Sequence, residues 1–335
     1  MTINLMNGGE FAPRPKDYIT KCGPVRPGGG CPLWLSFLER VTGDDDELQK
    51  YLQRVAGYCL TGHTSEHALF FLHGTGANGK TVFVNTLAGI MGDYAITAPM
   101  EVFVESRGER HPTELAMLRG ARLVISTETE EGRRWNESRI KAITGGDTIA
   151  ARFMRGDFFQ FKPTFKLMIV GNHKPRLRNV DEAIRRRLHL IPFNVTIPEA
   201  ERDLNLVESL KVEWPGILAW AVDGCREWKL FGLQPPEAVK AATDEYLAAE
   251  DSFALWQDEC IEQASDWTWE ASADLYASWN AYADRTGEFK GTMRRFSQAM
   301  QGKGFIPKRQ GGTGKRGFQG VIIKRPDYSD DPRHP

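Results

Sequence analysis

The stretch Gly74-Thr75-Gly76-Ala77-Asn78-Gly79-Lys80-Thr81 constrains this chain more than any other part of its sequence. It follows a short apolar run, Ala68–Leu72, and precedes a helix-like stretch, Val82–Met91. A strand, a glycine-rich loop and a helix in this order form a turn whose backbone N–H groups surround phosphate oxygens. In such a loop Lys80 reaches the β- and γ-phosphates, and the Thr81 hydroxyl binds Mg²⁺. All eight loop residues are therefore predicted to bind ATP, in preference to forming a mere structural turn.

Hydrolysis of ATP also needs an acidic side chain at the end of a neighbouring strand, to hold Mg²⁺ and polarise water. The apolar run Ala121–Ser126 leads directly to Glu128 and Glu130. Glu128 is the first choice for this acid and Glu130 the second, with solvated surface carboxylates as the alternative. A further apolar run, Lys166–Val170, ends close to Asn172, whose amide is placed to sense the γ-phosphate.

Three adjacent arginines, Arg185, Arg186 and Arg187, precede the apolar residues Leu188-His189-Leu190. An arginine at this place can stabilise transition-state charge, in its own subunit or in a neighbouring one. A cluster of arginines on a solvated surface is the simpler alternative.

The rest of the chain carries signs of DNA contact. Residues 133–187 hold 14 Lys/Arg against 5 Asp/Glu, and residues 291–325 hold 9 Lys/Arg and no acid, although the formal net charge is only −1. Such uneven charge favours local contact with a polyanion over two solvated faces. Within the first segment, Thr148–Ala151 and Phe158–Phe161 flank a turn at residues 154–157 and predict a β-hairpin.

The C-terminal segment predicts helices over Ser272–Thr286 and Thr292–Lys303, then strands at Gly304–Ile306 and Phe318–Ile323. Helix, helix, strand, basic loop and strand is the order of a winged helix. Near the other end, residues 33–61 have the apolar spacing of two helices. The chain has no apolar run long enough to span a membrane, and its five scattered cysteines lack metal-ligand spacing.

These motifs together resemble the superfamily 3 helicase domain of the phage and plasmid primase–helicase family, with poxvirus-type relatives. The matching stretches follow the order of that family along most of residues 15–195. They are 57–62, 73–81, 128–133, 141–147, 161–165, 171–175 and 181–193.

The resemblance implies an AAA+-like P-loop core. Together with the elements predicted from the residue pattern, the expected fold is α/β, with a parallel sheet, a small N-terminal helical unit and a C-terminal winged helix. The resemblance further implies an ATP- and Mg²⁺-dependent ring, expected to be a homo-hexamer, that moves along single-stranded and forked DNA, typically 3′ to 5′. The expected boundaries are 1–64 for the linker and helical unit, 65–196 for the core, 197–250 for a helical segment, 251–326 for the winged helix and 327–335 for a tail.

The resemblance also assigns residues. Lys80, Thr81, Glu128, Glu130 and Asn172 match its nucleotide and Mg²⁺ motifs, and Arg186 and Arg187 match its arginine pair. Lys141 falls in a motif of the family, and the hairpin around Arg155 matches the loop with which the family follows DNA. The residue types add Arg152 as a cation of that hairpin. The basic winged helix adds further candidate DNA contacts, which are Arg294, Arg295, Lys308, Arg309, Lys315 and Arg316. The phenylalanines Phe153, Phe158 and Phe159 supply stacking groups, although burial in a core is the alternative for at least two of them.

Family members commonly carry a primase module upstream, for which this chain has no room. We therefore expect a helicase without priming activity, which would be a truncated product or one half of a split pair whose primase is a separate protein. We expect it in the cytoplasm of a bacterial host. Alternative functions are an ATP-dependent initiator or loader that assembles on DNA without unwinding it, a small-molecule kinase, and an inactive prophage remnant.

Overall fold

The computed structural model describes residues 1–105, 113–128, 132–178, 180–265, 267–310 and 314–324, and of Glu128 the backbone only. The chain divides into two compact units, Met1–Tyr246 and Leu247–Pro335. Their hydrophobic clusters share no residue. The boundary falls inside helix α9 (Glu237–Glu250).

The first unit is built on a five-stranded parallel sheet with the strand order β4-β5-β8-β3-β9. The predicted strands at 68–72, 121–126 and 166–170 are confirmed, with ends that differ by no more than two residues. The two edge strands were not predicted, because β4 has only three residues and the apolar run of β9 is interrupted by His189 and ends at Pro192. The strands are β3 (Leu69–His73), β4 (Ala95–Thr97), β5 (Leu123–Glu128), β8 (Lys166–Gly171) and β9 (Leu188–Pro192).

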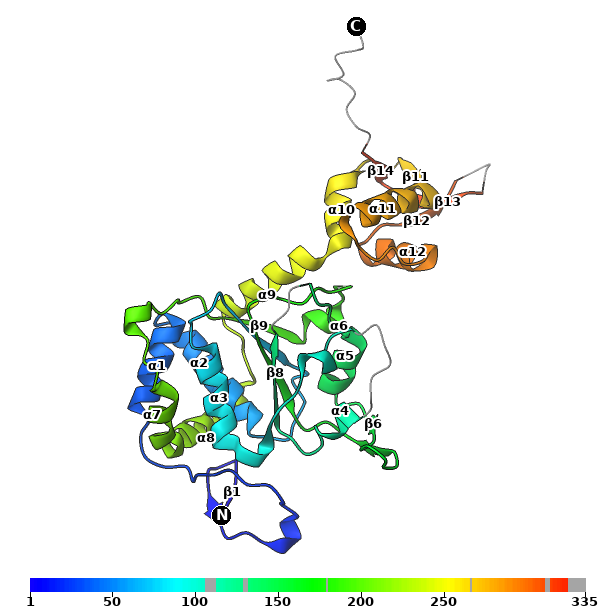
Figure 1. Ribbon diagram of the computed structural model, residues 1–335. Helices are drawn as coiled ribbons and strands as arrows, with labels where there is room; N and C mark the ends of the chain where they lie inside the picture. The colour runs from blue at the N-terminus through cyan, green and yellow to red at the C-terminus, as the bar shows by residue number, and fades with distance from the viewer. Residues whose placement is uncertain (106–112, 129–131, 179, 266, 311–313, 325–335) are drawn as a thin grey trace. The chain divides into compact units, whose positions relative to one another are not determined.

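Helices cover both faces of this sheet, which explains why its strands are apolar along their whole length. Figure 1 shows α1, α2, α3, α7 and α8 on one side of the strands and α4, α5 and α6 on the other. The helices are α1 (Pro32–Thr42), α2 (Asp46–Cys59), α3 (Lys80–Met91), α4 (Thr113–Ala116), α5 (Glu137–Gly145), α6 (Glu182–Arg185), α7 (Leu206–Val212) and α8 (Trp214–Phe231).

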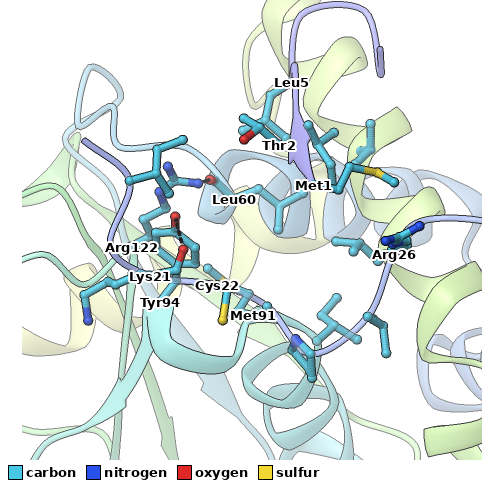
Figure 2. A pocket seen from close by; sticks show the side chains of 18 residues that line it. Met1, Thr2, Leu5, Lys21, Cys22, Arg26, Leu60, Met91, Tyr94 and Arg122 are labelled. Carbon is cyan, nitrogen blue, oxygen red and sulfur yellow. Dashed lines mark hydrogen bonds between the residues drawn. The ribbon is translucent and has the colours of Figure 1, made fainter. Parts of the chain in front are cut away.

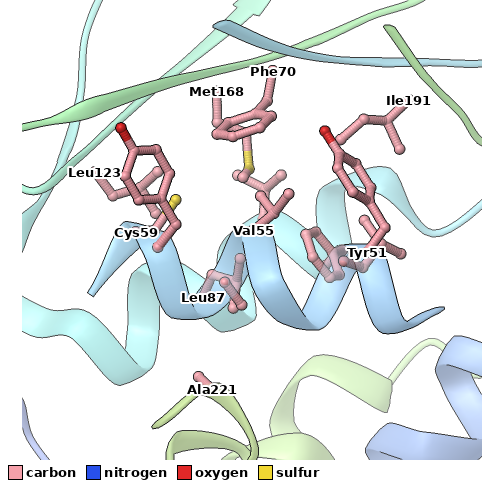
Figure 3. Close-up of a cluster of buried hydrophobic side chains, with 14 of the residues drawn as sticks. Tyr51, Val55, Cys59, Phe70, Leu87, Leu123, Met168, Ile191 and Ala221 are labelled. Atoms are coloured by element: carbon pink, nitrogen blue, oxygen red, sulfur yellow. The ribbon is translucent and has the colours of Figure 1, made fainter. Parts of the chain in front are cut away.

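The strand side chains alternate between the two faces. Phe70 lies in the cluster formed with α2, where Tyr51, Val55 and Cys59 point toward the sheet (Figure 3). Phe71, the next residue, meets the ring of Trp135 edge-on, with centroids 5.9 Å apart. Helix α2 therefore supports one face of the sheet. The apolar spacing of residues 48–58 predicts the helix but not its place against the sheet.

Helices α2 and α8 touch backbone to backbone. A Cβ added at Gly57 would lie 2.0 Å from the backbone nitrogen of Cys225, and one added at Gly224 would lie 2.0 Å from the carbonyl oxygen of Gln53. Only glycine permits this approach, so these two positions fix the support behind the sheet.

Shorter elements complete the first unit. The N-terminal segment is largely irregular, apart from the small hairpin of β1 (Thr2–Ile3) and β2 (Glu10–Phe11). The predicted hairpin between α5 and β8 is confirmed as β6 (Ile149–Ala151) and β7 (Phe159–Phe161). Single turns of 3₁₀ helix are η1 (Pro15–Asp17), η2 (Gly92–Tyr94), η3 (Met100–Val102) and η4 (Glu199–Glu201).

The second unit packs three helices against short antiparallel strands. Its core includes Trp256, Trp279 and Phe296, and the Trp256 ring lies 5.9 Å from that of Trp279 and 5.6 Å from that of Phe296, centroid to centroid. The helices are α10 (Ser252–Cys260), α11 (Ser272–Thr286) and α12 (Met293–Gly302), and the strands are β10 (Ile261–Gln263), β11 (Trp269–Ala271), β12 (Pro307–Arg309), β13 (Arg316–Gln319) and β14 (Val321–Ile323).

The predicted order of two helices and two strands is present here as α11, α12, β12 and β13–β14. The strand predicted at 304–306 is wrong in position and begins at Pro307. Gly304 adopts a φ of +90° and continues the turn after α12, which delays the strand. Pro307 is accommodated because β12 is an edge strand of the order β11-β13-β12.

Candidate nucleotide site

The glycine loop lies at the carboxyl edge of the parallel sheet, between β3 and α3. It lines a cavity of about 340 Å³ together with Thr127 at the end of β5 and Val170, Gly171 and Asn172 at the end of β8. Parallel strands all direct their carboxyl ends to one edge, so three separate sequence segments meet there. The predicted loop and Asn172 are thus brought together, and Thr127 joins them although it was not predicted as a site residue.

Lys80 is the buried cation of this cavity, with a relative exposure of 4%. Its ammonium donates hydrogen bonds to the Gly74 carbonyl at 2.8 Å, Asn78 Oδ1 at 3.0 Å and Asn172 Oδ1 at 3.2 Å. Burial lowers the pKa of Lys80. Three neutral acceptors match the three donors of the ammonium and leave its positive charge uncancelled, which favours an anionic partner.

Two glycines of the loop are required by their surroundings. Gly79 has a φ of +83°, and a Cβ there would lie 2.5 Å from Val41 Cγ1 on helix α1. A Cβ at Gly74 would lie 2.3 Å from the carbonyl oxygen of Phe193. The loop is therefore held between α1 and the end of β9, neither of which the motif itself identifies.

The acid-bearing strand is not the immediate neighbour of the loop strand. Strand β8 lies between β3 and β5, and its Gly171 pairs with His73 on one side and with Glu128 on the other. Asn172 is therefore placed between the loop and the end of β5. The backbone of Glu128 ends β5 at this edge, whereas Glu130 lies outside the described residues.

His73, the last residue of β3, adds a neutral side chain beside the loop. Burial, with the charges of Lys174 and Lys80, lowers the pKa of His73 to about 4. At neutral pH the His73 imidazole is therefore uncharged, and it adds no second positive charge beside Lys80.

The three arginines lie at the opposite edge of the sheet. Leu188, which follows them, pairs with Leu69 at the start of β3, so five residues of strand separate them from the loop, about 16 Å. Arg187 is 7% exposed, and it donates to Thr144 Oγ1 at 3.1 Å and to the Ala183 carbonyl at 2.6 Å. Arg185 pairs with Asp244 at 2.9 Å, and Arg186 is exposed. No arginine of this cluster is near the nucleotide cavity of its own chain.

Lys141 contacts Asp181 at 2.5 Å, and the same carboxylate caps α6 by accepting from the Ile184 N–H at 2.8 Å. This ion pair joins α5 to α6 just before the arginines. It gives Lys141 a role in positioning α6, whatever contact with DNA it also makes.

The β6–β7 hairpin presents cations beside rings. The Arg152 guanidinium lies over Phe158 at 4.9 Å, the Arg119 guanidinium lies over Phe159 at 5.1 Å, and Phe153 stacks on Phe159 at 5.4 Å. Phe153 and Phe158 are 52% and 63% exposed, so burial in a core does not explain them. The hairpin carries surface groups that suit stacking on bases.

Arg155 stands at the tip of this hairpin with a φ of +60° and an exposed side chain. The left-handed backbone is strained for a residue other than glycine. Glycine would adopt this backbone without strain.

Basic side chains also gather on the second unit. Arg309 on β12 is directly opposite Arg316 on β13, and like charges that face each other across a strand pair are destabilising. An anionic partner would relieve this repulsion. The predicted DNA-contact residues here are exposed, and they are Arg294, Arg295, Lys308, Arg309, Lys315 and Arg316.

A second cavity, of about 310 Å³, lies at the other end of α3, away from the loop (Figure 2). Apolar side chains such as Met91 line it, with Lys21, Arg26 and Arg122 among them. Two of its cations are engaged by the protein, since Lys21 donates to the Asp93 carbonyl and Arg122 to the Leu60 carbonyl. Of these two cavities, the first alone is formed by a glycine loop between a strand and a helix, which is the geometry of a phosphate site.

Comparison with known proteins gives three findings. Residues 72–187 match a protein family described as "Family of unknown function (DUF5906)". The chain is 29% identical over 236 residues to "Putative helicase L207/L206" of Acanthamoeba polyphaga mimivirus, covering 65% of this chain and 24% of that protein. It is 25% identical over 297 residues to "Putative helicase 022R" of Frog virus 3, covering 82% of this chain and 30% of that protein. The chain thus spans less than a third of the length of these relatives.

Among solved structures, the fold resembles that of "The apo structure of NrS-1 C terminal region (305-718)" with a TM-score of 0.52. The sequences are 13% identical, and the match covers 88% of this chain and 77% of the other. This supports the α/β fold with its parallel sheet. In the described part of the chain, no helix is long and apolar enough to cross a membrane.

Proposed function

We propose that this chain is an ATP-dependent DNA helicase that translocates as a ring during replication of a phage, prophage or plasmid. The observation that carries the proposal is the buried Lys80, held at the carboxyl edge of the sheet beside Asn172. The viral relatives whose names describe helicases support the same function.

The residues at the cavity fit ATP and Mg²⁺. The loop supplies backbone N–H groups and the Lys80 charge for phosphate, and the first turn of α3 adds the field of a helix N-terminus. The Thr81 hydroxyl and the Glu128 carboxylate would hold Mg²⁺, which neutralises phosphate charge and helps to activate water. Asn172 orients the groups around the γ-phosphate.

The position of the arginines supports a shared site and thus a ring. Because Arg186 is exposed at the far edge of the sheet, it acts on nucleotide only in a neighbouring copy. Heterologous contacts of this kind close into rings, for which a homo-hexamer is our proposal.

The β6–β7 hairpin and the basic second unit are the proposed DNA contacts. The hairpin combines Arg152 and Arg155 with exposed rings, which suits a single strand followed without sequence preference. The second unit, with its helices and basic β12–β13 pair, is proposed to act as a winged helix on duplex or forked DNA.

The test is ATP hydrolysis with and without single-stranded DNA. We expect Lys80→Ala to reduce DNA-stimulated hydrolysis at least a hundredfold, because one buried charge supports both phosphate binding and the transition state, about 3 kcal/mol or more. Lys50→Ala, which removes an exposed lysine from α2, is the matched control. Stimulated hydrolysis that survives Lys80→Ala would overturn the site assignment.

A second candidate is an initiator or loader that uses ATP only to assemble on DNA. The opposed Arg309 and Arg316 favour it, since they build a DNA surface that does not depend on the hairpin. Sustained displacement of a strand from a forked substrate separates the two functions, because assembly alone does not produce it.

A further inference from the structure

We propose that Asn78 is a positioning residue for Lys80, which it connects to the end of strand β9. The inference rests on the proposed nucleotide site and adds a role that the loop motif does not define. In that motif the position of Asn78 accepts any residue type.

The first observation is that the Asn78 amide is buried and hydrogen-bonded at both of its ends. Asn78 is 3% exposed. Its Nδ2 donates to the Phe193 carbonyl at 2.9 Å, while its Oδ1 accepts from Lys80 Nζ at 3.0 Å. One amide thus joins the lysine to a backbone group that lies 115 residues after Asn78 in the chain. A buried amide with both ends hydrogen-bonded is fixed in orientation, so it presents its oxygen, not its nitrogen, to the ammonium.

The second observation is that this amide belongs to a continuous brace. The Phe193 N–H donates to the His73 carbonyl at 2.8 Å, and the Ile197 N–H donates to the Ala77 carbonyl at 2.8 Å. The segment after β9 therefore runs along the end of β3 and the glycine loop, and it is bonded to His73 and Ala77, which both precede Asn78. These backbone hydrogen bonds hold the loop in place, and the Asn78 side chain connects the same segment to the Lys80 ammonium.

The third observation is the geometry around Gly74. A Cβ at this position would lie 2.1 Å from Asn78 Nδ2. The absence of a side chain at Gly74 is thus what admits the Asn78 amide to the Phe193 carbonyl. Gly74 and Asn78 form one arrangement that holds the lysine, in addition to leaving room for phosphate.

These contacts predict that Asn78 acts through Lys80. Hydrogen bonds to charged groups are worth about 1.5–3 kcal/mol, which corresponds to a tenfold to hundredfold change in affinity. We expect Asn78→Ala to weaken binding of a fluorescent ATP analogue with Mg²⁺ by at least tenfold. Asn85→Ala, an exposed asparagine on α3, is the matched control and leaves affinity unchanged.

A double-mutant cycle separates positioning from a general effect on the loop. In the Lys80→Ala background, we expect Asn78→Ala to change the affinity less than twofold, because the group through which it acts is gone. The titration extends to millimolar nucleotide so that weak binding stays measurable. An undiminished effect of Asn78→Ala in that background would overturn the proposal.

A second readout needs no nucleotide. The rate of acetylation of the Lys80 amine, followed by mass spectrometry of the whole folded protein, reports how firmly the ammonium is held. Asn78→Ala should raise this rate at least threefold relative to Lys50, whereas Asn85→Ala should not. Equal rates in the wild type and Asn78→Ala would contradict the proposal even if binding is lost through a disturbed loop.

The two proposals fail in different ways. If the wild type binds the ATP analogue no better than Lys80→Ala, the proposed nucleotide site is wrong. If the wild type binds in a Lys80-dependent manner and Asn78→Ala behaves like Asn85→Ala, only the positioning role is wrong.

Discussion

Two adjacent arginines, Arg186 and Arg187, lie in different surroundings. Arg187 is buried and donates to Thr144 and Ala183, which joins α5 to α6 at the amino edge of the sheet. Arg186 is exposed. The side chain available to another subunit is therefore Arg186.

We expect Arg187→Ala to lower the free energy of unfolding by about 2–3 kcal/mol, since it leaves buried acceptors unpaired. Arg186→Ala should alter stability by less than about 0.5 kcal/mol while reducing ATP turnover in the assembled protein. Urea unfolding and hydrolysis rates at several protein concentrations measure both effects. If Arg186→Ala lowered ATP turnover by the same factor in dilute monomers as in the assembled protein, the result would argue against action of Arg186 across a subunit contact.

His189 provides a second prediction at the residue scale. Burial lowers the pKa of His189 to about 4, and its Nδ1 lies 2.7 Å from the Tyr51 hydroxyl. In the unfolded chain the pKa is about 6.5. The folded state binds a proton at His189 less well than the unfolded chain does. The contribution of neutral His189 to the free energy of unfolding is therefore fully present above pH 6.5, and it is lost as the pH falls toward 4.

We expect the free energy of unfolding to fall by about 2 kcal/mol through His189 alone when the pH is lowered from 7 to 5. His189→Gln should remove that part of the pH dependence, which urea unfolding at pH 7, 6 and 5 measures. His73, whose pKa is also lowered to about 4, remains in both proteins and cancels in the comparison. Parallel pH profiles for the two proteins would contradict the prediction.

At the scale of elements, the β6–β7 hairpin combines an exposed charge with a strained turn. Arg155 adopts a left-handed backbone that glycine would adopt without strain. Arg155→Gly therefore removes the charge and keeps the turn, which makes it a cleaner test than alanine.

We expect Arg155→Gly to reduce strand displacement on a forked substrate at least tenfold, with nucleotide affinity within twofold of the wild type. Arg155→Lys keeps the charge and the strain, and should retain most of the activity. A variant Arg155→Gly with undiminished displacement would exclude the hairpin as the element that follows DNA.

At the scale of the whole molecule, the two units have separate cores. The first is organised around α2 and the sheet, and the second around Trp256, Trp279 and Phe296. The nucleotide cavity belongs entirely to the first unit. Nucleotide binding therefore adds stability to the first core by mass action.

We expect calorimetry to resolve two unfolding transitions. An ATP analogue with Mg²⁺ should raise the Tm of one of them and change the Tm of the other little. Trp256→Ala should lower the other transition, at a cost of about 3–5 kcal/mol, and leave nucleotide affinity unchanged. A single transition that shifts as a whole with nucleotide would show instead that the two cores unfold together.

Local sequence was sufficient to predict the glycine loop, the three apolar strands of the sheet, the helices α1, α2, α3, α11 and α12, and the β6–β7 hairpin. Each depends on residues close together in the chain, namely glycines in a turn, continuous apolar runs or apolar side chains at helical spacing. Chemical type alone also identified Lys80, Asn172 and the arginine cluster as candidates.

Only the tertiary structure decided how these candidates are arranged. The parallel sheet inserts β8 between β3 and β5, so that Asn172 reaches Lys80. It also sends Arg186 to the far edge, and it brings the Phe193 carbonyl to Asn78. Strand order and hydrogen bonds between distant segments arise from packing of the whole sheet, and no periodicity within one segment encodes them.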